Sequence, residues 1–136
     1  MIAYEDINED FYEEQTKSKN LLRSWFHNSR HKIVFKYVNK YRQDGMKIAD
    51  LGCGNVIWNY SKVPVIGVDV NEKFLNLDLK NNTINEKVVC ELDNIKLPDE
   101  SVDIVIVTEV LEHLPDLEKH LAEIRRILKP EGIVIS

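Results

Sequence analysis

The residues best suited to chemistry lie in two short stretches of the chain. The first, Ile48–Val56, carries two glycines after an apolar run, and the second, Val65–Val70, is an apolar run that contains Asp69 near its end. We interpret the two runs as neighbouring parallel strands. A glycine pair at a strand's end lets the backbone approach a ligand closely. A carboxylate at the tip of the adjoining strand can accept hydrogen bonds from both hydroxyls of a ribose. The pattern predicts a nucleoside-containing ligand at the carboxyl ends of an α/β sheet.

The kind of nucleoside is indicated by a missing glycine and an added acid. The dinucleotide fingerprint G-x-G-x-x-G needs a third glycine, but residues 55–57 are Asn-Val-Ile. Asp50 lies two residues before Gly52, where a carboxylate would repel a pyrophosphate and attract a cation. S-adenosylmethionine carries two suitable cations, an ammonium and a sulfonium. The pattern therefore favours S-adenosylmethionine and disfavours a nicotinamide oxidoreductase.

From about Lys47 to the C-terminus the chain resembles the class I S-adenosylmethionine-dependent methyltransferases. The resemblance is specific because several segments match in the right order and spacing. They are Asp50–Gly54, similar to the first motif; Gly67–Asp69, similar to the ribose-binding acid; Asp93–Pro98, similar to the "D-x-x-x-L-P" loop that faces adenine; Ser101–Val107 and Glu109–Leu114, similar to the fourth strand and its continuation; and Leu128–Gly132, similar to the turn into strand five.

The resemblance implies roles for the residues around the glycine pair. Asp69 is expected to bind the ribose hydroxyls, with a helix N-cap as the alternative role. Gly52 and Gly54 are expected to contact the ligand, although turn formation alone would also require them. Asp50 is expected near the methionine ammonium, acting directly or by holding the glycine turn. Cys53 and Val70, which adjoin these residues, complete this part of the expected cofactor-binding set.

Two later segments supply the remaining expected contacts with the cofactor. The resemblance makes Asp93 the partner of the adenine amino group, with an exposed loop acid as the alternative. The backbone of Asn94 and the side chain of Ile95 are expected beside the adenine ring. Glu109, just after the fourth strand, is expected where the family makes backbone contacts with the methionine part.

The sequence indicates little about the acceptor. His113 could act as a base, since a neutral imidazole can remove a proton at neutral pH, but a surface histidine is the commoner outcome. One interpretation places three polar residues of the N-terminal helix beside the acceptor pocket. Three aromatic residues are expected in the core. The polar residues are His27, Arg30 and His31, and the aromatic residues are Trp25, Phe26 and Trp58. No residue is a convincing nucleophile, and methyl transfer needs none.

Alternating helical and strand patterns predict a doubly wound α/β fold. Helices are expected from Leu21 to a stop at Asp44-Gly45, over about two turns of Asn55–Ser61, and over Glu72–Leu79 behind an Asn71 cap. A further helix is expected after an Asp116 cap, with Leu117, Leu121, Ile124 and Leu128 on one face. Strands are expected at Lys47–Leu51, Val65–Val70, Lys87–Leu92, Ile104–Val107 and Ile133–Ile135. The resemblance implies a Rossmann-like, mostly parallel sheet with strand order 3-2-1-4-5.

The resemblance also implies an incomplete sheet, because the family's last two strands have no counterpart. We divide the chain into an N-terminal helical segment, 1–44, and a cofactor-binding domain, 45–136. A fragment of a longer methyltransferase and a non-catalytic S-adenosylmethionine-binding or assembly module remain alternatives. An unpaired apolar fifth strand favours association or a frayed end, so either a homodimer through this edge or a mobile C-terminal end is expected. Val56 replaces the family's usual small residue, and the Asp50-to-Asp69 span is about one helical turn shorter than usual.

Composition narrows the class of protein. The 136 residues are 43% hydrophobic and 30% charged, typical of one globular domain, and the net charge of −5 disfavours nucleic acid as the acceptor. We therefore expect a small-molecule acceptor. No apolar run approaches the roughly 20 residues that cross a bilayer, and the acidic N-terminus lacks a signal-peptide pattern. Cys53 and Cys90 suggest neither a metal site nor a disulfide. A cytoplasmic protein is expected.

Overall fold

The fold is a five-stranded parallel sheet with helices on both faces. A computed structural model describes residues 21–136, with side chains from Asn28 onward. Its elements are α2 (Leu21–Tyr41), β1 (Ile48–Leu51), β2 (Ile66–Asp69), α3 (Glu72–Asn81), β3 (Glu86–Val89), β4 (Val102–Ile106), η2 (Leu111–His113), α4 (Leu117–Ile127) and β5 (Leu128–Ile135). The strand order is β3-β2-β1-β4-β5, and every neighbouring pair is parallel. The predicted class and strand order are confirmed.

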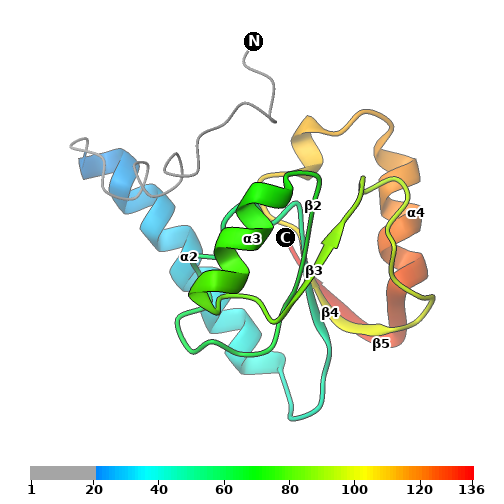
Figure 1. Ribbon diagram of the computed structural model, residues 1–136, viewed down its shortest axis with the longest axis horizontal. Coiled ribbons are helices and arrows are strands. Elements are labelled where there is room, and N and C mark those ends of the chain that lie inside the picture. The colour runs from blue at the N-terminus through cyan, green and yellow to red at the C-terminus, as the bar shows by residue number, and fades with distance from the viewer. Residues whose placement is uncertain (1–20) are drawn as a thin grey trace.

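The sheet is buried on both faces because its central strands are apolar at almost every position. Successive side chains of a strand point to opposite faces. Ile48 of β1 therefore lies in a core cluster with Val34 and Val38 of α2. Leu51 lies on the other face, in a cluster with Ile127 of α4. Figure 1 shows the same layers, with α2 and α3 on one side of the sheet and α4 on the other.

The register places the carboxyl ends of the three central strands beside one another. Asp50 of β1 pairs with Gly67 of β2 on one side and with Ile106 of β4 on the other. From β1 the chain winds outward to β3 and then returns to β4 on the other side of β1. Ligands of open α/β sheets bind at the carboxyl ends of the strands where the winding direction reverses. That position lies between β1 and β4.

The connection between β1 and β2 differs from the prediction, because turns rather than a helix cover Asn55–Ser61. Val56 and Trp58 are both buried in the cluster beneath α2 and α3. Two residues that are two positions apart cannot share one face of a helix, so a helix here would expose one of them. Asn59 fixes the irregular backbone instead, since its amide donates to the carbonyl oxygens of Val63 and Thr83, each at 2.8 Å.

The buried face of α4 also differs from the prediction. Leu117 and Leu121, expected to point inward, are each 45% exposed, whereas His120, Ile124 and Ile127 are buried. The buried positions have the i, i+4, i+7 spacing of one helical face, with His120 buried in place of Leu121. His120 is accommodated there because its Nδ1 lies 2.9 Å from the carbonyl oxygen of Asp116. The helix ends at Ile127, one residue before Leu128, the last position expected on its face.

Strand β5 begins earlier than predicted, at Leu128 instead of after Gly132. Leu128 pairs with Val102, and pairing resumes at Ile133 with Ile104 after a register shift. The intervening residues stay in the strand but form an irregularity in its pairing, and the position at 132 requires glycine. A Cβ there would lie 2.6 Å from Cδ1 of Leu128 and 2.9 Å from the carbonyl oxygen of Lys129.

Both predicted helix caps are present. The side chain of Asn71 accepts a hydrogen bond from the backbone N–H of Lys73 at the start of α3. Asp116 accepts one from the N–H of Lys119 at the start of α4. Such caps satisfy backbone donors that a helix leaves unpaired at its first turn. Across residues 21–136, no helix combines the length and the apolar character needed to span a membrane.

Candidate cofactor-binding site

The glycine turn after β1 has a backbone that ordinary side chains disfavour. Gly52 and Gly54 have φ values of +61° and +53°, in the left-handed region that glycine adopts without strain. The N–H of Gly52 donates to the carbonyl oxygen of Val68 at 2.8 Å, which ties the turn to β2. A Cβ at Gly52 would lie 2.8 Å from Cγ2 of Val110. The turn is therefore in contact with β2 and with the segment that follows β4.

Asp69 links this turn to the start of α3. One carboxylate oxygen accepts the backbone N–H of Gly54 and the other accepts that of Asn71, each at 2.8 Å. The residue is only 2% exposed. Hydrogen bonds from backbone amides to a buried carboxylate are charge-assisted and strong. Asp69 therefore has a structural role, and the expected ribose contact would add to it. The alternative role as N-cap belongs to Asn71 instead.

The amide of Asn71 provides a test of whether a polar ligand fits here. Its oxygen caps α3, but its Nδ2 is buried and has no acceptor among the residues that the structure describes. A buried donor without a partner costs about 1–3 kcal/mol. Asn71 lies two residues after Asp69, beside the expected ribose position. A ligand with hydroxyl or ring-nitrogen acceptors, such as a nucleoside, would remove this cost.

Asp50 lies near the end of β1, two residues before Gly52. Its Oδ2 accepts a hydrogen bond from the indole Nε1 of Trp58 at 2.6 Å. Burial raises the pKa of its carboxyl to about 7, although the indole hydrogen bond opposes the shift. The guanidinium of Arg30 on α2 is near enough to lower this pKa somewhat. A second cation at this position would stabilise the ionised carboxylate, as expected for a ligand ammonium.

Asp78 is a site residue that the sequence pattern did not reveal. It is fully buried on α3, and its two oxygens lie 3.2 and 3.1 Å from the backbone nitrogen of Val56, just beyond the glycine turn. Thr83 Oγ1 donates to the same carboxyl at 2.7 Å. Burial raises its pKa to about 6. The sequence offered one signal for this role. Asp78 lies three residues after Leu75, so the two share a helical face, and a charged residue on a buried face requires hydrogen-bond partners.

Cys53 and Val70 adjoin the two acids, as expected from their positions in the chain. Both side chains are half-buried. Burial, followed by the nearby Asp50 carboxyl, raises the pKa of the Cys53 thiol well above its usual range. The thiol is therefore neutral at physiological pH and unsuited to nucleophilic attack. Cys53 instead packs against the core beneath α2 and α3.

Glu109 connects this edge of the sheet with the N-terminal helix. It follows β4 with a φ of +59°, an unusual and strained value for a residue with a side chain. Its carboxylate lies 3.2 Å from Nη1 of Arg30 on α2. Arg30 is therefore near both Glu109 and Asp50. His31 is buried, His113 is exposed on η2, and the side chains of Trp25, Phe26 and His27 lie outside the described residues.

The loop that follows β3 is held mainly by α4. Asp93 pairs with Lys119 at 2.8 Å, which lowers the pKa of its carboxyl. Asn94 is exposed, whereas the Ile95 side chain is buried in the core beneath α4. The N–H of Cys90, at the start of the loop, donates to the carbonyl oxygen of Asp69 at 3.2 Å. The loop therefore leaves the sheet at the same edge as the other expected site residues.

We predict that Asp50 makes the protein less stable as pH rises. Its pKa is about 3.9 in an unfolded chain and about 7 in the folded one, so unfolding releases a proton between these values. The contribution of Asp50 is fully present below pH 4 and is lost by pH 7. Asp50→Asn keeps an acceptor for Trp58 and does not titrate. Its free energy of unfolding, measured by denaturant, should therefore rise relative to wild type from pH 4 to 7 and then level off.

The exposed Asp44 gives the matched control. Asp44→Asn should show no such rise relative to wild type over the same range. A difference between Asp50→Asn and wild type that stayed constant from pH 4 to 8 would show that the folded carboxyl titrates normally.

Comparisons with known proteins agree with this geometry. Residues 49–136 match the family model for the methyltransferase domain. The chain is 34% identical over 103 residues to 24-methylenesterol C-methyltransferase 2 of Arabidopsis thaliana, covering 68% of this chain and 28% of that protein. It is 31% identical over 118 residues to demethylmenaquinone methyltransferase of Staphylococcus epidermidis, covering 78% of this chain and 49% of that protein.

A solved TehB-like SAM-dependent methyltransferase of Corynebacterium glutamicum has the same fold, with a TM-score of 0.64 at 20% identity over 82% of this chain and 68% of that one. The chain spans about a quarter to a half of the length of the first curated relatives that it matches. The matched residues include all but the first residue of the described strands, the glycine turn and the buried acids Asp50, Asp69 and Asp78. The chain belongs to the methyltransferase-domain family, within the class I methyltransferases that use S-adenosylmethionine as cofactor.

Proposed function

We propose that this chain binds S-adenosylmethionine at the carboxyl ends of β1, β2 and β4, and that it serves the transfer of a methyl group to a small molecule. The observation that carries the proposal is the presence of two buried carboxyl groups, Asp50 and Asp69, on neighbouring strands beside a glycine turn with positive φ values. Buried acids are costly for a fold, and they concentrate at functional sites. This arrangement suits a ligand with a cation at one end and a ribose at the other.

Each expected residue has a distinct role in the proposal. Asp50 holds the methionine ammonium, and the backbone of Gly52 and Gly54 allows the ligand to approach. Asp69 and the free amide nitrogen of Asn71 bind the ribose. Asp93, Asn94 and Ile95 border the adenine, and Glu109 borders the methionine part. Cys53, within the glycine turn, and Val70, next to Asp69, contribute apolar contacts.

Bound S-adenosylmethionine would supply the electrophilic methyl group, whose transfer is an in-line displacement at carbon that neutralises the sulfonium. The protein therefore contributes mainly by alignment, and such positioning can lower a barrier by roughly 7–11 kcal/mol. A general base is needed only for an acceptor that must lose a proton early. The proposal assigns no base, and the exposed His113 is left without a catalytic role.

A small-molecule acceptor is supported by charge and by relatives. The net charge of −5 disfavours a phosphate backbone. The relatives named above are methyltransferases of a sterol and of demethylmenaquinone, both small molecules. Arg30 of α2 lies 3.2 Å from Glu109 and lowers the pKa of Asp50, the two expected methionine contacts. We propose that α2 forms one wall of the acceptor site.

The ribose role of Asp69 can be tested by changing the ligand instead of the fold. Each charge-assisted hydrogen bond is worth about 1.5–3 kcal/mol, so the wild-type chain should bind S-adenosylhomocysteine at least about tenfold more tightly than its 2′-deoxy analogue. Asp69→Ala should abolish this preference, because it removes the carboxylate that is proposed to accept a hydrogen bond from the 2′-hydroxyl. Isothermal titration measures both affinities.

The exposed Asp44→Ala is the matched control and should keep the wild-type preference. Denaturant unfolding of Asp69→Ala shows whether the variant remains folded, since two buried amides lose their acceptor. Equal affinity of the wild type for the two ligands would remove Asp69 from the ribose site. Binding of NADH in preference to S-adenosylhomocysteine would contradict the proposed function itself.

We also propose that the chain associates through the outer edge of β5. Within residues 21–136, β5 pairs on one side only, with β4. Beside it lies a hollow of about 400 Å³ lined by Tyr37 and Tyr41 of α2 and by Ile133–Ser136. Val134 is 46% exposed, and the two tyrosine rings stack at 6.3 Å between centroids. An exposed valine and two stacked tyrosine rings, next to a strand edge that no other described strand pairs, favour pairing with a second copy.

This association predicts a concentration-dependent dimer in sedimentation velocity. Val134→Lys should shift the protein toward monomer, because a charge on an edge strand opposes pairing. Val89→Lys places the same charge at an exposed valine of β3, the other edge strand, and should leave the dimer intact. A wild-type monomer at all concentrations, or equal effects of the two substitutions, would contradict this mode of association.

A further inference from the structure

Helix α4 presents a polar stripe to the loop that follows β3. Lys119, Glu123 and Arg126 have the i, i+4, i+7 spacing that places side chains on one helical face. Each contacts the loop: Lys119 at Asp93, Glu123 at the N–H of Ile95, and Arg126 at backbone carbonyls. The stripe therefore follows the loop along its length.

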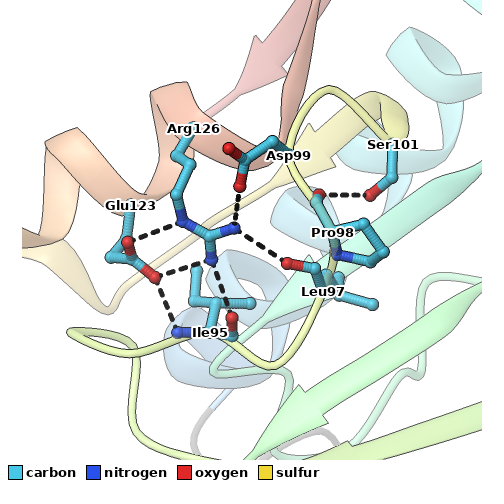
Figure 2. Close-up of polar contacts among 7 residues, drawn as sticks. All are labelled: Ile95, Leu97, Pro98, Asp99, Ser101, Glu123 and Arg126. Atoms are coloured by element: carbon cyan, nitrogen blue, oxygen red, sulfur yellow. Dashed lines mark hydrogen bonds and ion pairs between the residues drawn. The ribbon is translucent and has the colours of Figure 1, made fainter.

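Glu123 and Arg126 act as one unit, shown in Figure 2. Nε of Arg126 donates to Oε1 of Glu123 and Nη2 donates to Oε2, each at 2.8 Å, in the bidentate geometry that guanidinium and carboxylate prefer. The remaining donors of the guanidinium point into the loop. Nη2 reaches the carbonyl oxygen of Ile95 at 2.8 Å, and Nη1 reaches that of Leu97 at 2.9 Å.

The ion pair satisfies both backbone polar groups of Ile95. Its N–H donates to Oε2 of Glu123 at 2.8 Å, and its carbonyl accepts from Arg126. A loop without regular secondary structure has no neighbouring strand to satisfy such groups, so side chains must supply the partners. The pair thus takes the place of a neighbouring strand at this point in the loop.

Apolar packing holds the same segment from beneath. The side chains of Leu92, Ile95 and Leu97 are buried in the core under α4. Glu123 and Arg126 are 19% and 31% exposed, so water screens their pairing only in part. Nη1 of Arg126 also contacts Asp99 at 2.7 Å. Because the Asp99 side chain is 76% exposed, water screens this ion pair and it contributes little to the stability of the loop. The backbone at Ile95 is therefore the part of the loop that the pair fixes most firmly.

We propose that Glu123 and Arg126 are positioning residues for the adenine of the cofactor. They hold the backbone of Asn94 and Ile95 and the adjacent Asp93 in a binding arrangement before the ligand arrives. Preorganisation of this kind increases affinity because the ligand does not have to order the loop. The inference rests on the proposed function, which assigns residues 93–95 to the adenine. It adds that adenine binding by these loop residues depends on Glu123 and Arg126 of α4.

The test compares two neighbouring arginines of α4. Arg126→Gln removes the fork that binds Ile95 and Leu97, whereas Arg125→Gln changes an exposed side chain one position away. The ligands are S-adenosylhomocysteine and S-inosylhomocysteine, which differ at the amino group that Asp93 is proposed to bind. Isothermal titration gives both affinities, and amide hydrogen exchange reports on the Ile95 N–H.

The wild type and Arg125→Gln should prefer the adenosyl ligand. Arg126→Gln should bind that ligand about tenfold more weakly, as expected if a few loop residues must be ordered on binding, and should lose most of the preference for adenine. Its Ile95 amide should exchange faster. Arg126→Lys keeps the charge but lacks the planar fork, so it should reproduce these effects and provides a second variant should Arg126→Gln unfold.

A merely structural role would weaken both ligands equally and leave the base preference unchanged, and that result would overturn the proposal. Unchanged protection of the Ile95 amide in both Arg126 variants would also overturn it. Failure of the wild type to bind either ligand would instead overturn the proposed function. The two failures are therefore distinguishable.

Discussion

The carboxylate of Asp69 joins the parts of the chain on which the site depends. One oxygen holds the glycine turn after β1 and the other holds the first residue before α3, each through a backbone amide at 2.8 Å. Without these bonds the turn would be tied to β2 only by the hydrogen bonds from the N–H groups of Gly52 and Cys53 to the carbonyl oxygen of Val68. The parallel pairing of the strands also fixes the start of the turn, because it places the end of β1 between β2 and β4. Sheet order and one buried carboxylate together fix the position of the glycine turn.

Three buried acids gather on the α2 and α3 side of the sheet, and this is costly for the fold. Burial raises the pKa values of Asp50 and Asp78 to about 7 and about 6, respectively. Asp69 is buried as well, and its negative charge raises both pKa values further. A fold optimised only for stability would not collect acids in this way. The arrangement is understandable if the site binds a ligand that carries positive charge.

The features that could be predicted from the sequence were those encoded locally. The glycine pair, the acids at two strand ends and the caps Asn71 and Asp116 are short patterns with direct structural consequences. The strand order followed from the family resemblance that these patterns support. The start of β5 was misplaced because Lys129-Pro130 reads as a stop, whereas the strand continues through an irregularity in its pairing that includes Gly132.

The features that were missed depend on contacts between distant residues. Trp58 was assigned to the core, which is correct, but its hydrogen bond to Asp50 depends on the turns that replace the predicted helix. The buried face of α4 was misassigned because Leu117 and Leu121 outweigh His120 in hydropathy, although His120 finds a local acceptor. Asp78 and the Glu123–Arg126 pair lie far in sequence from the loops they hold. Only their placement on helical faces hinted at such roles.

The central claim is that the cofactor occupies the edge of the sheet where β1, β2 and β4 end. Backbone chemical-shift mapping by NMR during titration with S-adenosylhomocysteine tests it most directly. The account predicts saturable shifts centred on Gly52, Gly54, Val70 and Ile95, with little change at Tyr37 and Tyr41 beside β5. Shifts confined to the β5 side, or the absence of saturable shifts at the glycine turn, would contradict it.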